Sequence, residues 1–126
     1  MADIPHKLDQ AELRTLRRYR LARVREQLAK HDVAGAVLFD PINIRYAIDS
    51  SNMQVWTLHN PHRYVFVATE GPVVVFDGAQ CHHLSRDLET VDEVRLSTCW
   101  FFFVNGPRVE EMANRWADEM ADLIHQ

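Results

Sequence analysis

The sequence predicts a single α/β domain in which helices flank a mixed β-sheet. Three observations favour this fold class. The chain has 126 residues, which is enough for one domain and too few for two. Hydrophobic residues make up 47% of it and charged residues 25%, as in ordinary folded chains. Helical patterns and short apolar runs follow one another along it. We therefore treat residues 1–126 as one domain.

The chain is expected to open with a long helix over residues 9–30. Asp9 stands three positions before Glu12, the spacing of a capping box, and apolar residues follow at helical spacing. The run from Ala34 to Phe39 is short and almost wholly apolar, which predicts a strand buried on both faces.

The middle of the chain is expected to hold a loop and a hairpin. Residues 42–48 alternate between apolar and more polar positions, which suggests a strand, although a short helical turn fits nearly as well. Residues 49–62 show too little periodicity for a regular element, so we expect an irregular loop. Strands over 63–69 and 73–77, joined by Glu70-Gly71-Pro72, form the clearest hairpin.

In the last third of the chain, the spacing of apolar residues predicts a short helix over 79–88, a weaker strand over 91–96 and a helix from Val109 onward. Between them stand four aromatic residues, Trp100 to Phe103. On a strand, alternate side chains point to opposite faces, so either both faces are covered within the domain or one contributes to an interface, and we favour the interface. The sequence stops directly after the last helix, at Gln126, and we expect it to be part of a longer polypeptide.

Charge and composition narrow the choice of partners. Eight basic and three acidic residues lie between Lys7 and Lys30, in a chain of net charge −4. An acidic remainder would repel nucleic acid, so we expect a solvated helix that faces an acidic surface. No secretion signal or membrane-length apolar run is seen, and Cys81 and Cys99 are too few for a disulfide framework. We expect a cytoplasmic protein with no nucleic-acid or membrane partner.

No motif predicts catalysis or metal binding within this chain. In Cys81-His82-His83, adjacent helical side chains point about 100° apart, so at most one or two of them could share an ion. Pro61 separates His59 from His62 in a way that a zinc-binding helix does not allow. A Cys81 nucleophile is a remote alternative, and the isolated glycines form no phosphate loop. We therefore expect no cofactor and no catalytic residue here.

The loop before the hairpin gathers aromatic, cationic and hydrogen-bonding side chains. Such groups suit a small polar or charged ligand, through ion pairing or cation–π contact. A loop that its tryptophan anchors to the core explains the composition equally well. The candidate ligand-contacting residues are Trp56, His59, Asn60 and Arg63.

The stretch from Ala36 to Tyr46, Ala-Val-Leu-Phe-Asp-Pro-Ile-Asn-Ile-Arg-Tyr, resembles the start of the N-terminal domain of creatinase, prolidase and Xaa-Pro aminopeptidase. In that family an arginine-rich helix leads into an apolar strand, an Asn-x-x-Tyr segment, a loop and a hairpin. The stretch from Asp49 to Trp56, with His59-Asn60 and Arg63-Tyr64, is similar to the branch that includes metal-dependent dimethylsulfoniopropionate lyases.

The resemblance implies a non-catalytic domain of a larger enzyme. The catalytic part in this family is a C-terminal pita-bread domain, absent from this chain, that holds two divalent metal ions through Asp, His and Glu ligands. The family forms homodimers in which the N-terminal domain of one subunit lies near the active site of the other. Asn43, Ile44 and Tyr46 match the family motif and are assigned to the fold. The residues expected to cap the neighbouring site are Trp56, His59, Asn60 and Arg63.

Two chemistries remain open for the parent enzyme. Hydrolysis of peptide bonds beside proline is the commonest activity of the family. However, Ile48-Asp49-Ser50 stands where Xaa-Pro peptidases usually have Thr-Gly or Ser-Gly, which disfavours a peptide substrate. Lyase chemistry on dimethylsulfoniopropionate is the alternative, with the sulfonium against Trp56. A stand-alone binding module that uses the basic helix is the alternative from another class.

Overall fold

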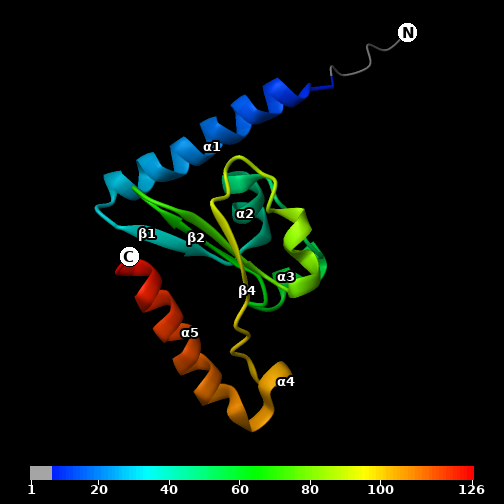
Figure 1. Ribbon diagram of the computed structural model, residues 1–126, viewed down its shortest axis with the longest axis vertical. Coiled ribbons are helices and arrows are strands. Elements are labelled where there is room, and N and C mark those ends of the chain that lie inside the picture. The colour runs from blue at the N-terminus through cyan, green and yellow to red at the C-terminus, as the bar shows by residue number, and fades with distance from the viewer. Residues whose placement is uncertain (1–6) are drawn as a thin grey trace.

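The computed structural model describes residues 7–126, which form a four-stranded sheet with helices on both faces (Figure 1). The predicted class, α/β with a mixed sheet flanked by helices, is confirmed. The strand order is β1-β2-β3-β4. The β1–β2 and β2–β3 pairs are antiparallel and the β3–β4 pair is parallel. The strands are β1 (Gly35–Leu38), β2 (Tyr64–Ala68), β3 (Val73–Asp77) and β4 (Glu93–Leu96).

The helices divide between the two faces of the sheet (Figure 1). Two of them, α1 and α2, cover one face, and α5 crosses the other. Shorter helices lie in the connections. The helices are α1 (Gln10–Lys30), α2 (Pro41–Ile48), α3 (Gln54–Leu58), η1 (Ala79–Leu84), α4 (Phe102–Asn105), η2 (Gly106–Arg108) and α5 (Val109–Ile124).

The two middle strands supply the core on both sides. Because side chains alternate along a strand, β2 and β3 feed one cluster under α1 and α2 and another under α5, and every residue of both strands is buried. The first cluster comprises Leu21, Ile44, Ala47, Ile48, Val65, Val67, Val73 and Val75. The second comprises Tyr64, Phe66, Ala68, Val74, Phe76, Met120 and Leu123.

Side-chain caps fix the starts of the first two helices. Asp9 accepts hydrogen bonds from the backbone N–H groups of Ala11 and Glu12, both at 2.8 Å, and the Glu12 carboxylate accepts from the N–H of Asp9. This is the predicted capping box. Asp40 caps α2 in the same way, with Pro41 as its first residue. The segment 42–48, left open by its sequence, is therefore helical.

Several local predictions were wrong. Strand β1 is only half-buried because it is an edge strand that pairs with β2 alone. The segment 49–62 is not wholly irregular: it contains α3, whose five residues are too few to show a period. The expected helix over 79–88 is a 3-10 helix that ends at Leu84.

The aromatic run was also misassigned. Phe101 is extended and α4 begins at Phe102, so the four aromatic residues do not share a strand. Trp100 instead packs on Trp116 of α5, with ring centroids 5.5 Å apart. None of the helices within residues 7–126 is long and apolar enough to cross a bilayer.

The close approach of β1 and β2 requires glycine at position 35. A Cβ there would lie 2.8 Å from the carbonyl oxygen of Val67, so Gly35→Ala forces the strands apart. We expect the free energy of unfolding, measured by urea denaturation, to fall by about 1–3 kcal/mol. The matched control is Gly78→Ala, whose Cβ would make an ordinary 3.5 Å contact with His62. Equal losses in the two variants would contradict this explanation.

Candidate functional site

A buried ion pair lies at the end of the β2–β3 hairpin. Arg63 immediately precedes β2 and Asp77 ends β3, and the pairing of Tyr64 with Phe76 brings them to the same end of the sheet. Arg63 Nε donates to Asp77 Oδ2 at 2.7 Å, and the two side chains are 1% and 0% exposed. Each charge is removed from water and depends on the other for its stabilisation.

Further hydrogen bonds join this ion pair to the segment that follows α2. Asn52 Nδ2 donates to the second carboxylate oxygen of Asp77 at 2.9 Å. The Arg63 guanidinium donates to the hydroxyl groups of Ser50 and Ser85, which are themselves 2.7 Å apart. The backbone from Ser50 to Asn52 is thereby tied to the sheet, directly before α3.

Helix α3 begins directly after this anchored segment and is bonded to it. The buried Thr57 hydroxyl lies 3.3 Å from the backbone carbonyl oxygens of both Asn52 and Met53. Met53 itself has a φ of +34°, an uncommon conformation for a residue with a side chain. A helix of five residues is not stable alone, so the bond between Asn52 and Asp77 and the contact of Trp56 with Phe103 keep it folded.

Trp56, His59 and Asn60 meet Phe101 and Phe103 around a pocket of about 240 Å³. The rings of Trp56 and Phe103 meet edge to face, with centroids 6.1 Å apart. The structure thus brings together three of the four candidate residues. The two phenylalanines were missed because sequence patterns do not report contacts between segments so far apart.

The polar groups of the pocket have different roles. Asn60 Nδ2 donates to the carbonyl oxygen of Trp56 at 2.7 Å, and its Oδ1 accepts from the N–H of His62 at 3.0 Å. Asn60 therefore shapes the turn after α3. The His59 imidazole makes no hydrogen bond with any residue in 7–126, and no aspartate, glutamate, lysine or arginine lines the pocket. His59 is thus the polar side chain that remains available to a ligand.

A histidine–cysteine contact holds the aromatic segment opposite α3. His62 Nδ1 lies 2.9 Å from Cys99 Sγ. Burial raises the pKa of the Cys99 thiol, so the thiol is protonated at neutral pH, and the tautomer of the imidazole decides which of the two groups donates. Asn105 Nδ2 donates to the carbonyl oxygens of Cys99 and Phe101, at 2.6 and 3.2 Å. These bonds set the course of the chain into α4.

Arg63, the fourth candidate residue, does not line the pocket. Its guanidinium is buried in the ion pair described above. Arg63 therefore stabilises the segment before α3 and does not contact a ligand in the pocket. Cys81 and His82 are half-buried on η1, and His82 Nε2 has no hydrogen-bond partner. Within the described part of the chain, no three His, Cys, Asp or Glu side chains gather to bind a metal ion.

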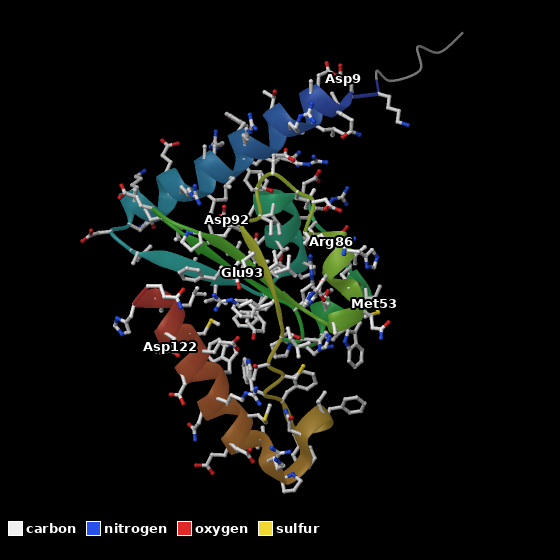
Figure 2. The ribbon with its side chains drawn as sticks, viewed as in Figure 1. Asp9, Met53, Arg86, Asp92, Glu93 and Asp122 are labelled. Atoms are coloured by element: carbon white, nitrogen blue, oxygen red, sulfur yellow. The ribbon has the colours of Figure 1, made fainter. Side chains whose placement is uncertain are left out.

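Exposed apolar side chains lie on α3 and α4, the two helices nearest the pocket, and at the residue before α3. We call this the α3–α4 surface, and Figure 2 shows Met53 at its edge beside α3. Phe103 is 81% exposed despite its contact with Trp56. Grouped exposed apolar residues are typical of interaction sites. The surface comprises Met53, Val55, Leu58, Phe102, Phe103 and Val104.

Two curated proteins are similar to nearly the whole chain, and both are named dimethylsulfoniopropionate lyase DddP. The protein from Roseovarius nubinhibens is 36% identical over 113 residues, which cover 90% of this chain and 25% of the relative. That from Roseobacter denitrificans is 36% identical over 118 residues, or 94% and 26%. The chain thus spans about a quarter of the length of these relatives. No family model matches it.

The buried ion pair should contribute far more to stability than an exposed one. Arg63→Met leaves the Asp77 carboxylate buried without its partner, and we expect a loss of about 3–5 kcal/mol in unfolding free energy. The control is Arg95→Met, which breaks the exposed pair between Arg95 and Glu93; there we expect about 0–1 kcal/mol. Urea denaturation measures both losses, and a small loss in Arg63→Met would show that the buried pair is not required.

Proposed function

We propose that this chain is the non-catalytic N-terminal domain of a longer enzyme of the creatinase and prolidase family, most similar to dimethylsulfoniopropionate lyases. Its α3–α4 surface packs on the catalytic part of a homodimeric enzyme, and its pocket covers the bound substrate. The names of the two relatives and their greater length support this proposal, as does the resemblance of the segment from Ala36 to Tyr46.

The observation that carries the proposal is a small pocket between two walls, α3 and the segment from Phe101 to Phe103, with an exposed apolar rim. Its volume of about 240 Å³ lies below the roughly 300–1,000 Å³ usual for small-molecule sites. Its rim is apolar and exposed, at Phe103 above all. A second protein surface laid on this rim would bury the apolar side chains and close the pocket at the same time.

The lining suits a small cation that also carries a carboxylate. Trp56, Phe101 and Phe103 supply aromatic rings, whose faces attract a sulfonium or ammonium group. No carboxylate lines the pocket, so the aromatic faces are the groups of this pocket that attract the cation. His59 is free to donate a hydrogen bond to an anionic group of the same molecule. Dimethylsulfoniopropionate has both of these groups.

Within the enzyme, this chain binds and covers substrate. The family resemblance assigns the two divalent metal ions to the catalytic domain of the longer protein. What the pocket supplies is orientation of the substrate and exclusion of water, both of which raise the rate of a reaction carried out by other groups.

Hydrolysis beside proline is the competing chemistry for the parent enzyme. Ile48-Asp49-Ser50 departs from the peptidase pattern, and Asp49 is engaged as a C-cap and in an ion pair with Arg17. Neither curated relative has a peptidase name. Lyase activity is therefore the stronger proposal, and testing the full-length protein on both substrates separates the two.

Kinetics of the full-length enzyme test the role of the pocket. Trp56→Ala removes a ring that contacts substrate, so we expect the KM for dimethylsulfoniopropionate to rise about tenfold, with dimethyl sulfide release as the assay. Trp56→Phe keeps an aromatic face and should recover most of the loss. Leu96→Ala, which changes an exposed apolar side chain on β4, is the control. Unchanged kinetics in Trp56→Ala would refute substrate binding by this pocket.

A further inference from the structure

A second exposed surface lies on α1 and α2, over the sheet face opposite α5 (Figure 1). Tyr19 is 57% exposed, Ile42 71% and Tyr46 42%, and one arginine lies over each tyrosine ring. We call this the α1–α2 surface. Its residues are Tyr19, Arg20, Arg23, Ile42 and Tyr46. It shares no residue with the α3–α4 surface, so the inference below does not rest on the proposed function.

The two arginines of this surface are held in place by aromatic rings. Arg20 Cζ lies 5.6 Å from the centroid of Tyr46, and Arg23 Cζ lies 5.8 Å from that of Tyr19. Arg23 also donates to the Tyr19 hydroxyl at 3.1 Å. Stacking restrains a guanidinium while leaving N–H groups at its edge free to donate. Less side-chain entropy is then lost on binding.

Other arginines of α1 are used within the domain. Arg17 pairs with Asp49 and Glu89, and Arg25 donates to backbone carbonyl oxygens after β2. By contrast, Arg20 and Arg23 form no ion pair with a carboxylate in residues 7–126. Within residues 7–126 no carboxylate is in direct contact with either guanidinium, although the charge of Glu26 contributes to raising the pKa of Arg23, after the larger effect of the hydrogen bond with Tyr19.

The charge of the region selects the kind of partner. Residues 7–30 contain eight basic and three acidic side chains, so two copies meeting through this surface would repel each other. Arg and Tyr are enriched at binding hot spots, and a guanidinium pairs best with a carboxylate. Ile42 adds an apolar contact for which a nucleic-acid backbone has no counterpart.

We propose that the α1–α2 surface binds an acidic polypeptide segment. Two carboxylates of the segment pair with Arg20 and Arg23, and an apolar side chain between them packs on Ile42. The rings of Tyr19 and Tyr46 exclude water from these contacts, which strengthens the ion pairs.

A short synthetic peptide of glutamates with one central leucine is the probe, and fluorescence anisotropy at low salt measures its binding to the full chain. Arg20→Ala with Arg23→Ala should weaken binding about tenfold or more. The matched control is Arg14→Ala with Arg18→Ala, which removes the same charge from exposed positions of α1; we expect a loss below about threefold. Ile42→Ala should weaken binding of this peptide but not of a peptide that lacks the leucine.

Circular dichroism checks that all variants remain folded. Equal losses in the two double variants would overturn the proposal, because they would reduce the effect to net charge. Failure of the wild-type chain to bind the peptide would overturn it as well. Tighter binding of a single-stranded oligonucleotide than of the peptide would also overturn it and would favour nucleic acid as the partner.

Discussion

The buried ion pair of Arg63 and Asp77 is the constraint on which the rest of the site depends. Pairing of β2 with β3 places both residues at one end of the hairpin, away from water. A buried ion pair is tolerated only when its remaining donors and acceptors are also satisfied. Here Asn52 and the N–H of Gly78 donate to Asp77, and Ser50 and Ser85 accept from Arg63. The chain between α2 and α3 must therefore pass over this end of the sheet, which fixes where α3 stands.

The other wall of the pocket is anchored independently. The phenol oxygen of Tyr64 accepts a hydrogen bond from the N–H of Thr98 at 3.0 Å. Burial raises the pKa of Tyr64 to about 12, so the phenol stays neutral across the physiological range. Together with the contact between His62 and Cys99, this bond directs the chain toward Phe101. The pocket thus forms where two segments meet that the sheet holds separately.

The sequence was most informative where structure is local and repetitive. The capping box at Asp9 predicted the start of α1, and helical periodicity predicted α5. Short elements were missed for a physical reason: α3 and α4 owe their structure to tertiary contacts that no local pattern records. The position of Arg63 shows the same limit. Its nearness in sequence to Trp56 suggested a shared ligand site, whereas strand alternation turns it inward toward Asp77, which the sequence did not identify as its partner.

Hydrogen–deuterium exchange on Asn52→Ala tests most directly whether the buried network holds the pocket. This change removes the link between Asp77 and the segment before α3 but leaves the ion pair intact, and Ser51→Ala at the exposed neighbouring position is the control. We expect amide exchange over residues 53–60 to accelerate about tenfold or more, as local opening becomes easier, while β2 and β3 stay protected. Unchanged exchange over 53–60 would show that α3 is held by other contacts and would contradict the account.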